Sequence, residues 1–368
     1  MLIDNIIIDF FISFFLNGGI IFYLSNGGKI GLDESSADGK SGPQKFHVKP
    51  TARIGGSAIF IAFFIVMAIE WVITKKPAYI YLAVSTLPIF MGGIADDVTR
   101  KVSPRIRLAA ALVSAFLAVY FLNAIITRTD IGFIDGLLSI KIAAVIFTVF
   151  ALTGVSNSFN IIDGYNGLSS VVSILILFSL GYVSFELGDA FLVNVCLILA
   201  FAILGFLIWN YPFGKIFLGD GGAYLIGLVI AVVSVLLVDR HKNISPWFPL
   251  LLCIYPIFET LFSMNRRRIK KNSPLEADAF HLHTLIYKRL VPHILGANIK
   301  GNQLARNYST SPFLWLLVAS FSIIPALLFR DNTFVLIIFV LLFISVYIWL
   351  YKSIADFKLC RFLRNKKS

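Results

Sequence analysis

Two adjacent carboxylates, Asp96 and Asp97, follow directly after an apolar run that ends at Ala95. Two like charges about 4 Å apart repel each other by roughly 4 kcal/mol at an effective dielectric constant near 20. Such a pair usually needs a cation, a shared proton or a basic partner. The pair is therefore a candidate catalytic site. A solvated helix end beside Arg100 and Lys101 is the plainer alternative.

Asn160 and Asp163 lie three residues apart at the end of another apolar run. If the helix continues to this point, both side chains share one face and direct oxygen ligands to one place. Gly164 and Gly167 then allow a sharp change of direction. An Asx-capped turn between two membrane helices explains the same residues, and both interpretations stay open.

Asp220 follows Phe217 and Gly219 and precedes two further glycines. This spacing places a carboxylate at the start of a predicted helix, with backbone N–H groups nearby. An N-cap is the simpler role. A magnesium ligand beside a pyrophosphate is the other, because flanking glycines let a phosphate approach the backbone closely.

His281 and His283 occupy a long basic loop that also carries Arg266. Alternate residues point to the same side of an extended chain. A zinc site is one interpretation, but the third and fourth ligands that zinc needs are absent nearby. Two histidines with several arginines suit phosphate recognition better. Simple solvent exposure is the remaining alternative.

A fifth polar cluster, Pro-Thr-Ala-Arg-Ile-Gly-Gly over residues 50–56, adds Thr51 and Arg53. The five clusters together contain acidic metal ligands and phosphate-binding bases. That combination indicates a magnesium-dependent phosphoryl-transfer site at a membrane surface.

The elements that must position these residues are membrane helices. The chain has 368 residues, of which 58% are hydrophobic and only 14% charged, so its solvent must be lipid. Apolar runs of about 20 residues, enough to cross roughly 30 Å of hydrocarbon, predict an all-α, polytopic membrane bundle that forms a single domain. Eleven helices are expected, over residues 4–25, 54–73, 78–95, 108–127, 137–155, 167–185, 190–209, 221–238, 246–264, 312–329 and 333–351.

Basic residues predict the orientation, because Lys and Arg accumulate in cytoplasmic loops. One set of alternate connections holds 25 of them and the other set 6. The N-terminus should therefore lie outside and the C-terminus in the cytoplasm, with all five polar clusters on the cytoplasmic side. The basic residues are dispersed over several loops, so we expect no nucleic-acid partner. The basic tail, 352–368, should lie on anionic lipid headgroups.

The ordered motifs resemble those of the polyprenyl-phosphate N-acetylhexosamine-1-phosphate transferases. Residues from about 45 to 290 carry Pro-Thr-x-Arg-x-Gly-Gly, Asp-Asp, Asn-x-x-Asn-x-x-Asp-Gly, Phe-x-Gly-Asp and His-x-His in that order. The resemblance implies that the phosphate of a lipid carrier, undecaprenyl phosphate, attacks the β-phosphorus of a UDP-N-acetylhexosamine and releases UMP. It also implies a Mg²⁺ ion, which Mn²⁺ could replace, and the bacterial inner membrane as the location.

The resemblance further implies roles for individual residues. Asp96 or Asp97 would deprotonate or position the carrier phosphate, and Asp97 as a nucleophile is the two-step alternative. Asp163 would orient the nucleotide or complete the polar centre. Asp220 is the implied metal ligand, with Asn160 as a second one. The implied substrate-binding residues are Lys49, Thr51, Arg53, Asn160, Phe217, Gly219, Arg266, His281 and His283.

Two residues depart from the family pattern. Asn166 stands where many members have a second aspartate, so any mechanism that needs a carboxylate there is in doubt. Thr284 stands at the third position of the histidine run. The second departure favours the branch that initiates O-antigen or common-antigen glycans over the peptidoglycan branch. Neither the particular N-acetylhexosamine nor a homodimer is settled by these residues.

A transporter or lipid-carrier flippase is the competing class of function. Such a protein should carry polar or broken helices near the midplane. Here Glu70, Lys141 and Glu259 each lie toward the end of a predicted span, and the sequence shows no internal repeat. A transferase is therefore favoured. The loop 265–311 is too long for a simple connector, and short helices or a flap over the nucleotide are expected there.

Overall fold

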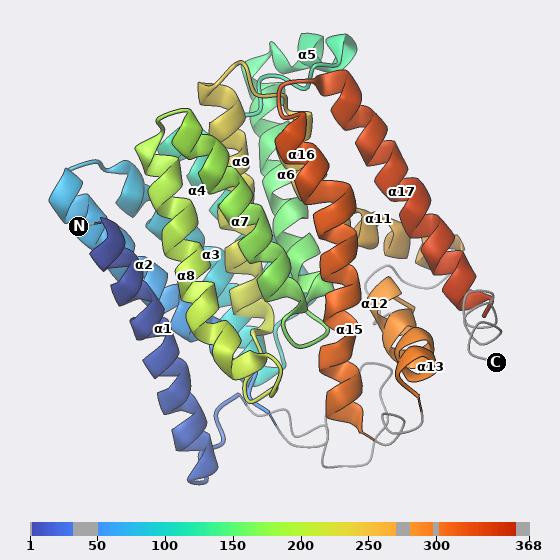
Figure 1. The fold of residues 1–368 in the computed structure, drawn as a ribbon. Coiled ribbons are helices and arrows are strands. Elements are labelled where there is room, and N and C mark those ends of the chain that lie inside the picture. The colour runs from blue at the N-terminus through green and yellow to red at the C-terminus, as the bar shows by residue number, and fades with distance from the viewer. Residues whose placement is uncertain (1, 32–50, 270–279, 297–301, 358–368) are drawn as a thin grey trace.

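The computed structural model describes residues 2–31, 51–269, 280–296 and 302–357. Over these ranges the protein is an all-helical bundle without extended β-strands (Figure 1). Ten of its helices are long and apolar enough to cross a membrane. The prediction of a polytopic, all-α membrane protein is confirmed.

The ten long helices run in both directions along one bundle axis (Figure 1). A short helix, α5 (Gly132–Leu138), lies at one end of the bundle. The long helices are α1 (Leu2–Ser25), α2 (Gly55–Thr74), α3 (Ala78–Thr99), α4 (Pro104–Leu122), α6 (Lys141–Ile162), α7 (Leu168–Glu186), α8 (Ala190–Asn210), α9 (Gly219–Arg240), the continuous run of α15 (Gln303–Val318), η3 (Ala319–Ile323) and α16 (Ile324–Leu328), and α17 (Thr333–Ala355).

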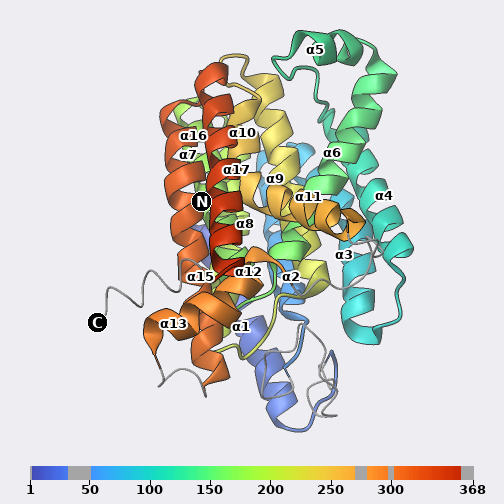
Figure 2. The same cartoon turned by 90° about the vertical axis from the view of Figure 1, so that its right-hand side faces the viewer.

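The predicted span over 246–264 is not a single transmembrane helix. It is split at Cys253 into α10 (Trp247–Leu252) and α11 (Ile254–Ile269), and Figure 2 shows α11 lying across the bundle. Pro256 favours a break, because inside a continuous helix its ring would clash with the carbonyl of Leu252, although α3 and α15 accommodate Pro88 and Pro312 in their interiors. The break places Pro256 in the first turn of α11, where a proline is tolerated. The eleven predicted spans are thus corrected to ten long helices and one broken pair.

Connections between helices gather at two ends of the bundle. At the end called the site end, the backbone N–H of Phe217 donates to the carbonyl of Ala52 at 2.8 Å. At the opposite end, called the far end, the N–H of Ser245 donates to the carbonyl of Arg330 at 3.0 Å. The described parts of the five polar clusters all lie at the site end, as the alternation of helices predicts. The side of the membrane that each end faces stays a prediction.

The segment after α11 forms short helices at the site end: α12 (Leu282–Leu285), η2 (Ile286–Leu290) and α13 (Val291–Leu295). Residues 270–279 and 297–301 of the predicted loop lie outside the described residues, as do most of the predicted basic tail and Lys49. The suggested flap over a nucleotide stays a prediction.

Helix α9 is the most buried of the ten long helices, and its first turn touches two neighbours backbone to backbone. A Cβ atom added to Gly56 of α2 would lie 2.3 Å from the Cα of Gly222. One added to Gly93 of α3 would lie 2.5 Å from the Cα of Gly221. Glycines at these four positions let three helices meet at the site end, as small residues do in membrane helix interfaces.

We therefore expect Gly93→Ala to destabilise the protein by about 1–3 kcal/mol, because the methyl group can be accommodated only if α3 and α9 move apart. Thermal unfolding in detergent, followed by tryptophan fluorescence, measures this as a lower melting temperature. Gly154→Ala is the matched control, since a Cβ there meets nothing within 4 Å. Equal melting temperatures for the two variants would contradict the close approach of the helices.

Candidate active site

The carboxylate of Asp97 holds the start of α9. Asp97 lies near the end of α3 and is only 3% exposed. Its two oxygens accept hydrogen bonds from the backbone N–H groups of Asp220 and Gly221, each at 2.9 Å. Gly219 has a left-handed backbone with φ +79°, and a Cβ there would lie 2.0 Å from the carbonyl oxygen of Arg53. Asp97 therefore caps α9 from a neighbouring helix and needs a glycine beside it.

Asp220 is held between two arginines. Its Oδ1 is 3.2 Å from a guanidinium nitrogen of Arg53, and its Oδ2 accepts a hydrogen bond from Arg107. Arg107 also pairs with Asp96 at 3.0 Å. The other oxygen of Asp96 accepts from the backbone N–H of Val102 at 3.1 Å. The repulsion between the adjacent carboxylates is thus reduced in two ways, at Asp97 by backbone N–H groups and at Asp96 by a cation.

Asn160 and Asp163 lie at the end of α6, beside this cluster. The amide of Asn160 donates to the hydroxyl of Tyr224 at 3.0 Å, and its amide oxygen accepts no hydrogen bond from the described residues. Asp163, the C-cap residue of α6, interacts with Arg53, Asp97 and Asp220. Burial raises the pKa of Asp163 to about 7, and the two carboxylates add to this while Arg53 opposes it. The structure therefore brings Asp163 into the same electrostatic centre.

Residues 51–56 and 216–219 run beside each other and form one wall of this centre. The N–H of Gly55 donates to the carbonyl of Phe217 at 2.9 Å, and that of Gly56 to Leu218 at 2.8 Å. Thr51 and the Phe217 ring are both half-buried at this wall. Three segments that are far apart in sequence, 51–56, 96–107 and 160–163, therefore meet at residues 217–224, where α9 begins.

His281 and His283 form a second, adjacent cluster. Their rings stack with centroids 5.0 Å apart, and both residues are buried. Nδ1 of His281 lies 2.9 Å from Glu259 of α11, a carboxylate that is fully buried. Glu259 also accepts from the hydroxyl of Tyr347 at 2.7 Å. The alternative of solvent-exposed histidines is therefore wrong.

His283 is the histidine that faces the α6–α7 turn. Its Nε2 would lie 3.1 Å from a Cβ atom on Gly164, the residue after Asp163. Arg266 takes a different position, because its guanidinium donates to the hydroxyl of Tyr351 on α17 at 2.9 Å. Arg266 therefore packs against the C-terminal helix, in addition to any contact with substrate.

Asn166 makes hydrogen bonds to other segments of the protein. Its backbone N–H donates to the side chain of Asn307 at 2.9 Å, and its amide donates to the carbonyl of Pro212 at 3.3 Å. Ser311 of α15 donates to the carbonyl of Asn166 at 2.7 Å. The residue that departs from the family pattern thus fastens the α6–α7 turn to two neighbouring segments.

The oxygen atoms of this centre can be compared with the ligands that a magnesium ion requires. Within the described ranges, no group of three or more His, Cys, Asp or Glu side chains is arranged to hold a metal. Magnesium does not require such a cage, because it binds through one or two carboxylates together with water and substrate phosphates. Asp220 supplies a carboxylate, and the amide oxygen of Asn160 is uncommitted. These oxygen ligands fit Mg²⁺, once Asp220 is released from one of its arginines.

The sequence alone did not indicate Arg107 and Tyr224 of this centre or Glu259 of the histidine cluster. Arg107 is one of several basic loop residues, and Glu259 is a charge near the end of an apolar run. Tyr224 lies four residues, about one helical turn, after Asp220. This i+4 spacing could have indicated that the two side chains share a face of the helix. The residues that contact Arg107 lie 11 and 113 positions away in the sequence, and those that contact Glu259 through their side chains lie 22 and 88 positions away.

Known proteins resemble part of this chain. A family model described as "Glycosyl transferase family 4" matches residues 79–238. An "undecaprenyl-phosphate alpha-N-acetylglucosaminyl 1-phosphate transferase" of Thermotoga maritima is 30% identical over 247 residues, which are 67% of this chain and 72% of the relative. The chain belongs to glycosyl transferase family 4.

Two further relatives are also named as transferases. A "phospho-N-acetylmuramoyl-pentapeptide-transferase" of Staphylococcus carnosus is 30% identical over 259 residues, covering 64% of this chain and 78% of the relative. A "probable undecaprenyl-phosphate N-acetylglucosaminyl 1-phosphate transferase" of Bacillus subtilis is 28% identical over 250 residues, covering 65% and 66%. The predicted resemblance to this superfamily of phosphotransferases is confirmed. The match of the family 4 model includes both Asp96 and Asp220.

The capping of α9 by Asp97 leads to a prediction about the stability of this family 4 protein. We expect Asp97→Asn to lower the stability by about 1–3 kcal/mol, because an amide nitrogen would face one of the two backbone N–H donors and leave it unsatisfied. Asp331→Asn is the control, because Asp331 is exposed at the far end and its side chain makes no hydrogen bond or ion pair with the described residues. Melting temperatures in detergent distinguish the two. A wild-type melting temperature for Asp97→Asn would contradict the capping role.

The buried Glu259 makes a second prediction. Glu259→Gln should loosen the short helices of residues 280–296, because a neutral amide holds His281 less strongly than a carboxylate does. We expect trypsin to cleave after the exposed Lys288 severalfold faster, as measured by mass spectrometry of timed digests. Tyr347→Phe is the control, because it leaves the bond to His281 in place. Unchanged cleavage in Glu259→Gln would show that other contacts anchor the segment.

Proposed function

We propose that this chain transfers an N-acetylhexosamine 1-phosphate from a UDP-sugar to undecaprenyl phosphate and releases UMP. The observation that carries the proposal is the position of Asp220 between Arg53 and Arg107, at the end of a membrane bundle. Two guanidinium groups are the side chains best suited to bind the phosphates of donor and acceptor. The printed names of the relatives describe transfer of this kind.

The arginines would bind phosphate by exchanging partners. In the structure their charges are balanced by Asp220 and Asp96. A donor pyrophosphate can replace a carboxylate at a guanidinium, since both are oxyanions. The N-terminus of α9 is a less suitable phosphate site than helix N-termini usually are, because Asp97 already occupies two of its N–H groups.

Displacement of Asp220 from an arginine would free a carboxylate for Mg²⁺, with the amide oxygen of Asn160 as a second ligand. Mn²⁺ has the same preference for oxygen ligands. When bound, the ion would neutralise the charge on the donor phosphates and polarise the phosphorus that is attacked. Asp163 would complete the polar centre through its interactions with Arg53 and Asp220.

The transfer itself would be a direct displacement. An oxygen of the carrier phosphate forms a bond to the β-phosphorus of the donor. The bond from that phosphorus to the oxygen bridging the α-phosphate breaks, and its electron pair leaves with UMP. Asp96, the more exposed of the adjacent carboxylates, would position the carrier phosphate. Both oxygens of Asp97 are committed to α9, which supports one step over a covalent intermediate on Asp97.

The lipid tail of the carrier needs an apolar path that reaches the site. A cavity of 340 Å³ lies between α6, α9, α10 and residues 125–134, and most of its lining residues are apolar. It extends from Trp247, near the far end, to Val155 and Ile257. Val155 lies five residues before Asn160 along α6, so this cavity ends about 8 Å along the helix from the proposed centre. Part of an isoprenoid chain could lie in this cavity.

The excess of basic residues in one set of connections supports a cytoplasmic site in a bacterial inner membrane. Donors of this kind are soluble nucleotides, which fits that side. The names of two relatives and the incomplete histidine run at Thr284 support N-acetylglucosamine as the sugar and initiation of a cell-surface glycan as the role.

The proposal is tested by UMP release from purified protein with undecaprenyl phosphate, Mg²⁺ and a panel of UDP-N-acetylhexosamines. We expect Asp220→Asn to reduce the rate by about 100-fold or more, because it removes a charge that acts in the transition state. A chelator should abolish release. Asp331→Asn, exposed at the far end and outside the apolar cavity, is the matched control and should keep the wild-type rate. Equal rates for the two variants would contradict the role given to Asp220.

A further inference from the structure

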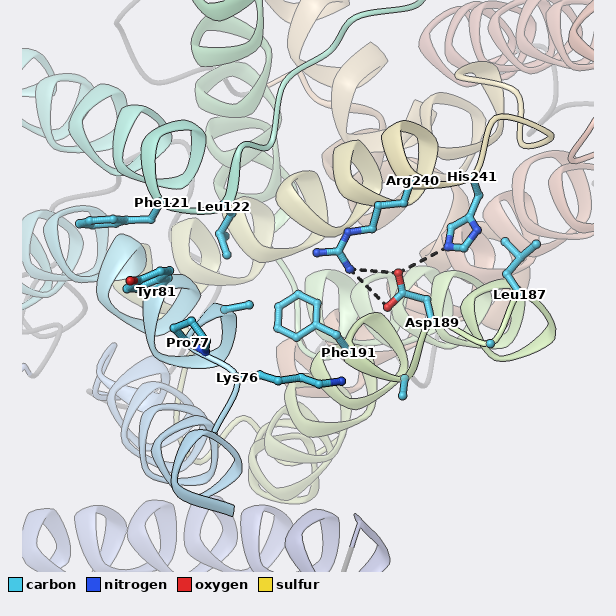
Figure 3. Close-up of a pocket in the computed structure, with 13 residues that line it drawn as sticks. Lys76, Pro77, Tyr81, Phe121, Leu122, Leu187, Asp189, Phe191, Arg240 and His241 are labelled. Carbon is cyan, nitrogen blue, oxygen red and sulfur yellow. Dashed lines mark hydrogen bonds and ion pairs between the residues drawn. The ribbon is translucent and has the colours of Figure 1, made fainter. Parts of the chain in front are cut away.

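A cavity with charged and aromatic residues in its lining lies at the far end of the bundle, opposite the candidate active site (Figure 3). Its volume is about 640 Å³. The α2–α3 and α7–α8 connections and the ends of α4 and α9 form its walls. The side chains used below are Lys76, Tyr81, Phe121, Asp189, Phe191 and Arg240.

Asp189 organises one wall of this cavity. It caps α8 by accepting from the backbone N–H of Leu192 at 3.1 Å, and it pairs with Arg240 at 3.0 Å and with His241 at 3.4 Å. Burial alone would raise the pKa of Asp189, but these hydrogen bonds outweigh burial and hold it below its usual value. The guanidinium carbon of Arg240 also lies 5.2 Å from the centroid of the Phe191 ring. Asp189 and Arg240 therefore form a fixed, mutually neutralised pair.

Lys76 adds a positive charge that this pair does not balance. Among the residues that the structure describes, no carboxylate pairs with its ammonium group. Figure 3 shows the side chain extending into the cavity, with the nitrogen beneath Phe191 and directed toward Asp189. The lining contains two cations, Lys76 and Arg240, against the single carboxylate of Asp189. These charged side chains sum to a net positive charge, which suits an anion.

The opposite wall is aromatic and continues onto the outer surface of α4. Tyr81 stacks on Phe121 with centroids 5.2 Å apart, and Phe121 meets Tyr120 at 5.3 Å. Tyr120 in turn stacks near Phe116 at 6.4 Å, and these two side chains are 71% and 53% exposed. Such exposed rings on a membrane helix face lipid, and aromatic residues near helix ends lie at the membrane–water interface.

A net positive cavity that opens onto a lipid-facing aromatic surface suits one kind of ligand, an anion that carries acyl chains. We propose that this cavity binds the phosphate headgroup of an anionic membrane lipid. Lys76 contacts the phosphate, Arg240 forms the fixed edge of the pocket, and the acyl chains lie along Tyr81, Phe121 and Tyr120. Free phosphate could use the same cations, but it would leave the aromatic surface without a role. The site is distinct from the proposed transferase centre and does not depend on that activity.

The full-length protein in detergent tests this proposal through its melting temperature. Short-chain phosphatidylglycerol is the anionic probe, and phosphatidylcholine of the same chain length and inorganic phosphate are the comparison probes. We expect phosphatidylglycerol to raise the melting temperature of the wild type, and the other two probes to raise it less. Lys76→Gln should lose at least half of that rise.

Lys75→Gln is the matched control, because Lys75 is adjacent and exposed but does not line the cavity. It should keep the full rise. Both variants should melt near the wild-type temperature without lipid, which shows that they fold. The proposal is overturned if Lys76→Gln responds to phosphatidylglycerol as Lys75→Gln does. An equal rise with phosphatidylcholine would show that the site does not require an anionic headgroup. An equal rise with inorganic phosphate would show that it does not require a lipid. Either result would contradict the proposal.

Discussion

The carboxylate of Asp97 joins two helices whose contacting residues are 123 positions apart in the chain. By accepting the first N–H groups of α9, it fixes the end of that helix against α3. Unsatisfied N–H groups at a buried helix start would be costly, so the interaction is strongly specified. Once α9 begins at this point, Asp220 emerges at the same place and lies between Arg53 and Arg107. The glycine contacts to α2 and α3 are needed because the helices must come this close.

The charges of the site are arranged so that each buried carboxylate has a partner. A buried ion is expensive without one, and at the end of a membrane bundle the surrounding lipid adds to that cost. Arg107 serves two carboxylates, and Asp97 uses backbone dipoles in place of a cation. A centre built in this way can bind highly charged phosphates, because an incoming oxyanion takes over an arginine and a carboxylate becomes available for a cation. The same residues thus stabilise the unliganded fold and provide the ligands for chemistry.

Much of this arrangement could be predicted from the sequence, because the signals are local. Apolar runs located the ten long helices, and the parity of those helices placed the described parts of the five polar clusters at one end. The span at 246–264 was wrong because an apolar run does not show where a helix breaks, and prolines do not decide it either: Pro256 stands next to a break, whereas Pro88 and Pro312 lie inside continuous helices. Arg107 and Glu259 were missed as site residues because each depends on partners from distant segments. The capping role of Asp97 was also hidden, since only the folded chain brings it to the start of α9.

The most direct test of the account is the identity of both products formed from a UDP-N-acetylhexosamine and undecaprenyl phosphate. Mass spectrometry of the lipid fraction and chromatography of the nucleotide fraction measure them together. The account predicts sugar-pyrophosphate-undecaprenol and UMP in equal amounts, because the bond that breaks lies between the two donor phosphates. UDP as the nucleotide product, or UMP formed without a lipid product, would contradict transfer of a sugar phosphate at this site.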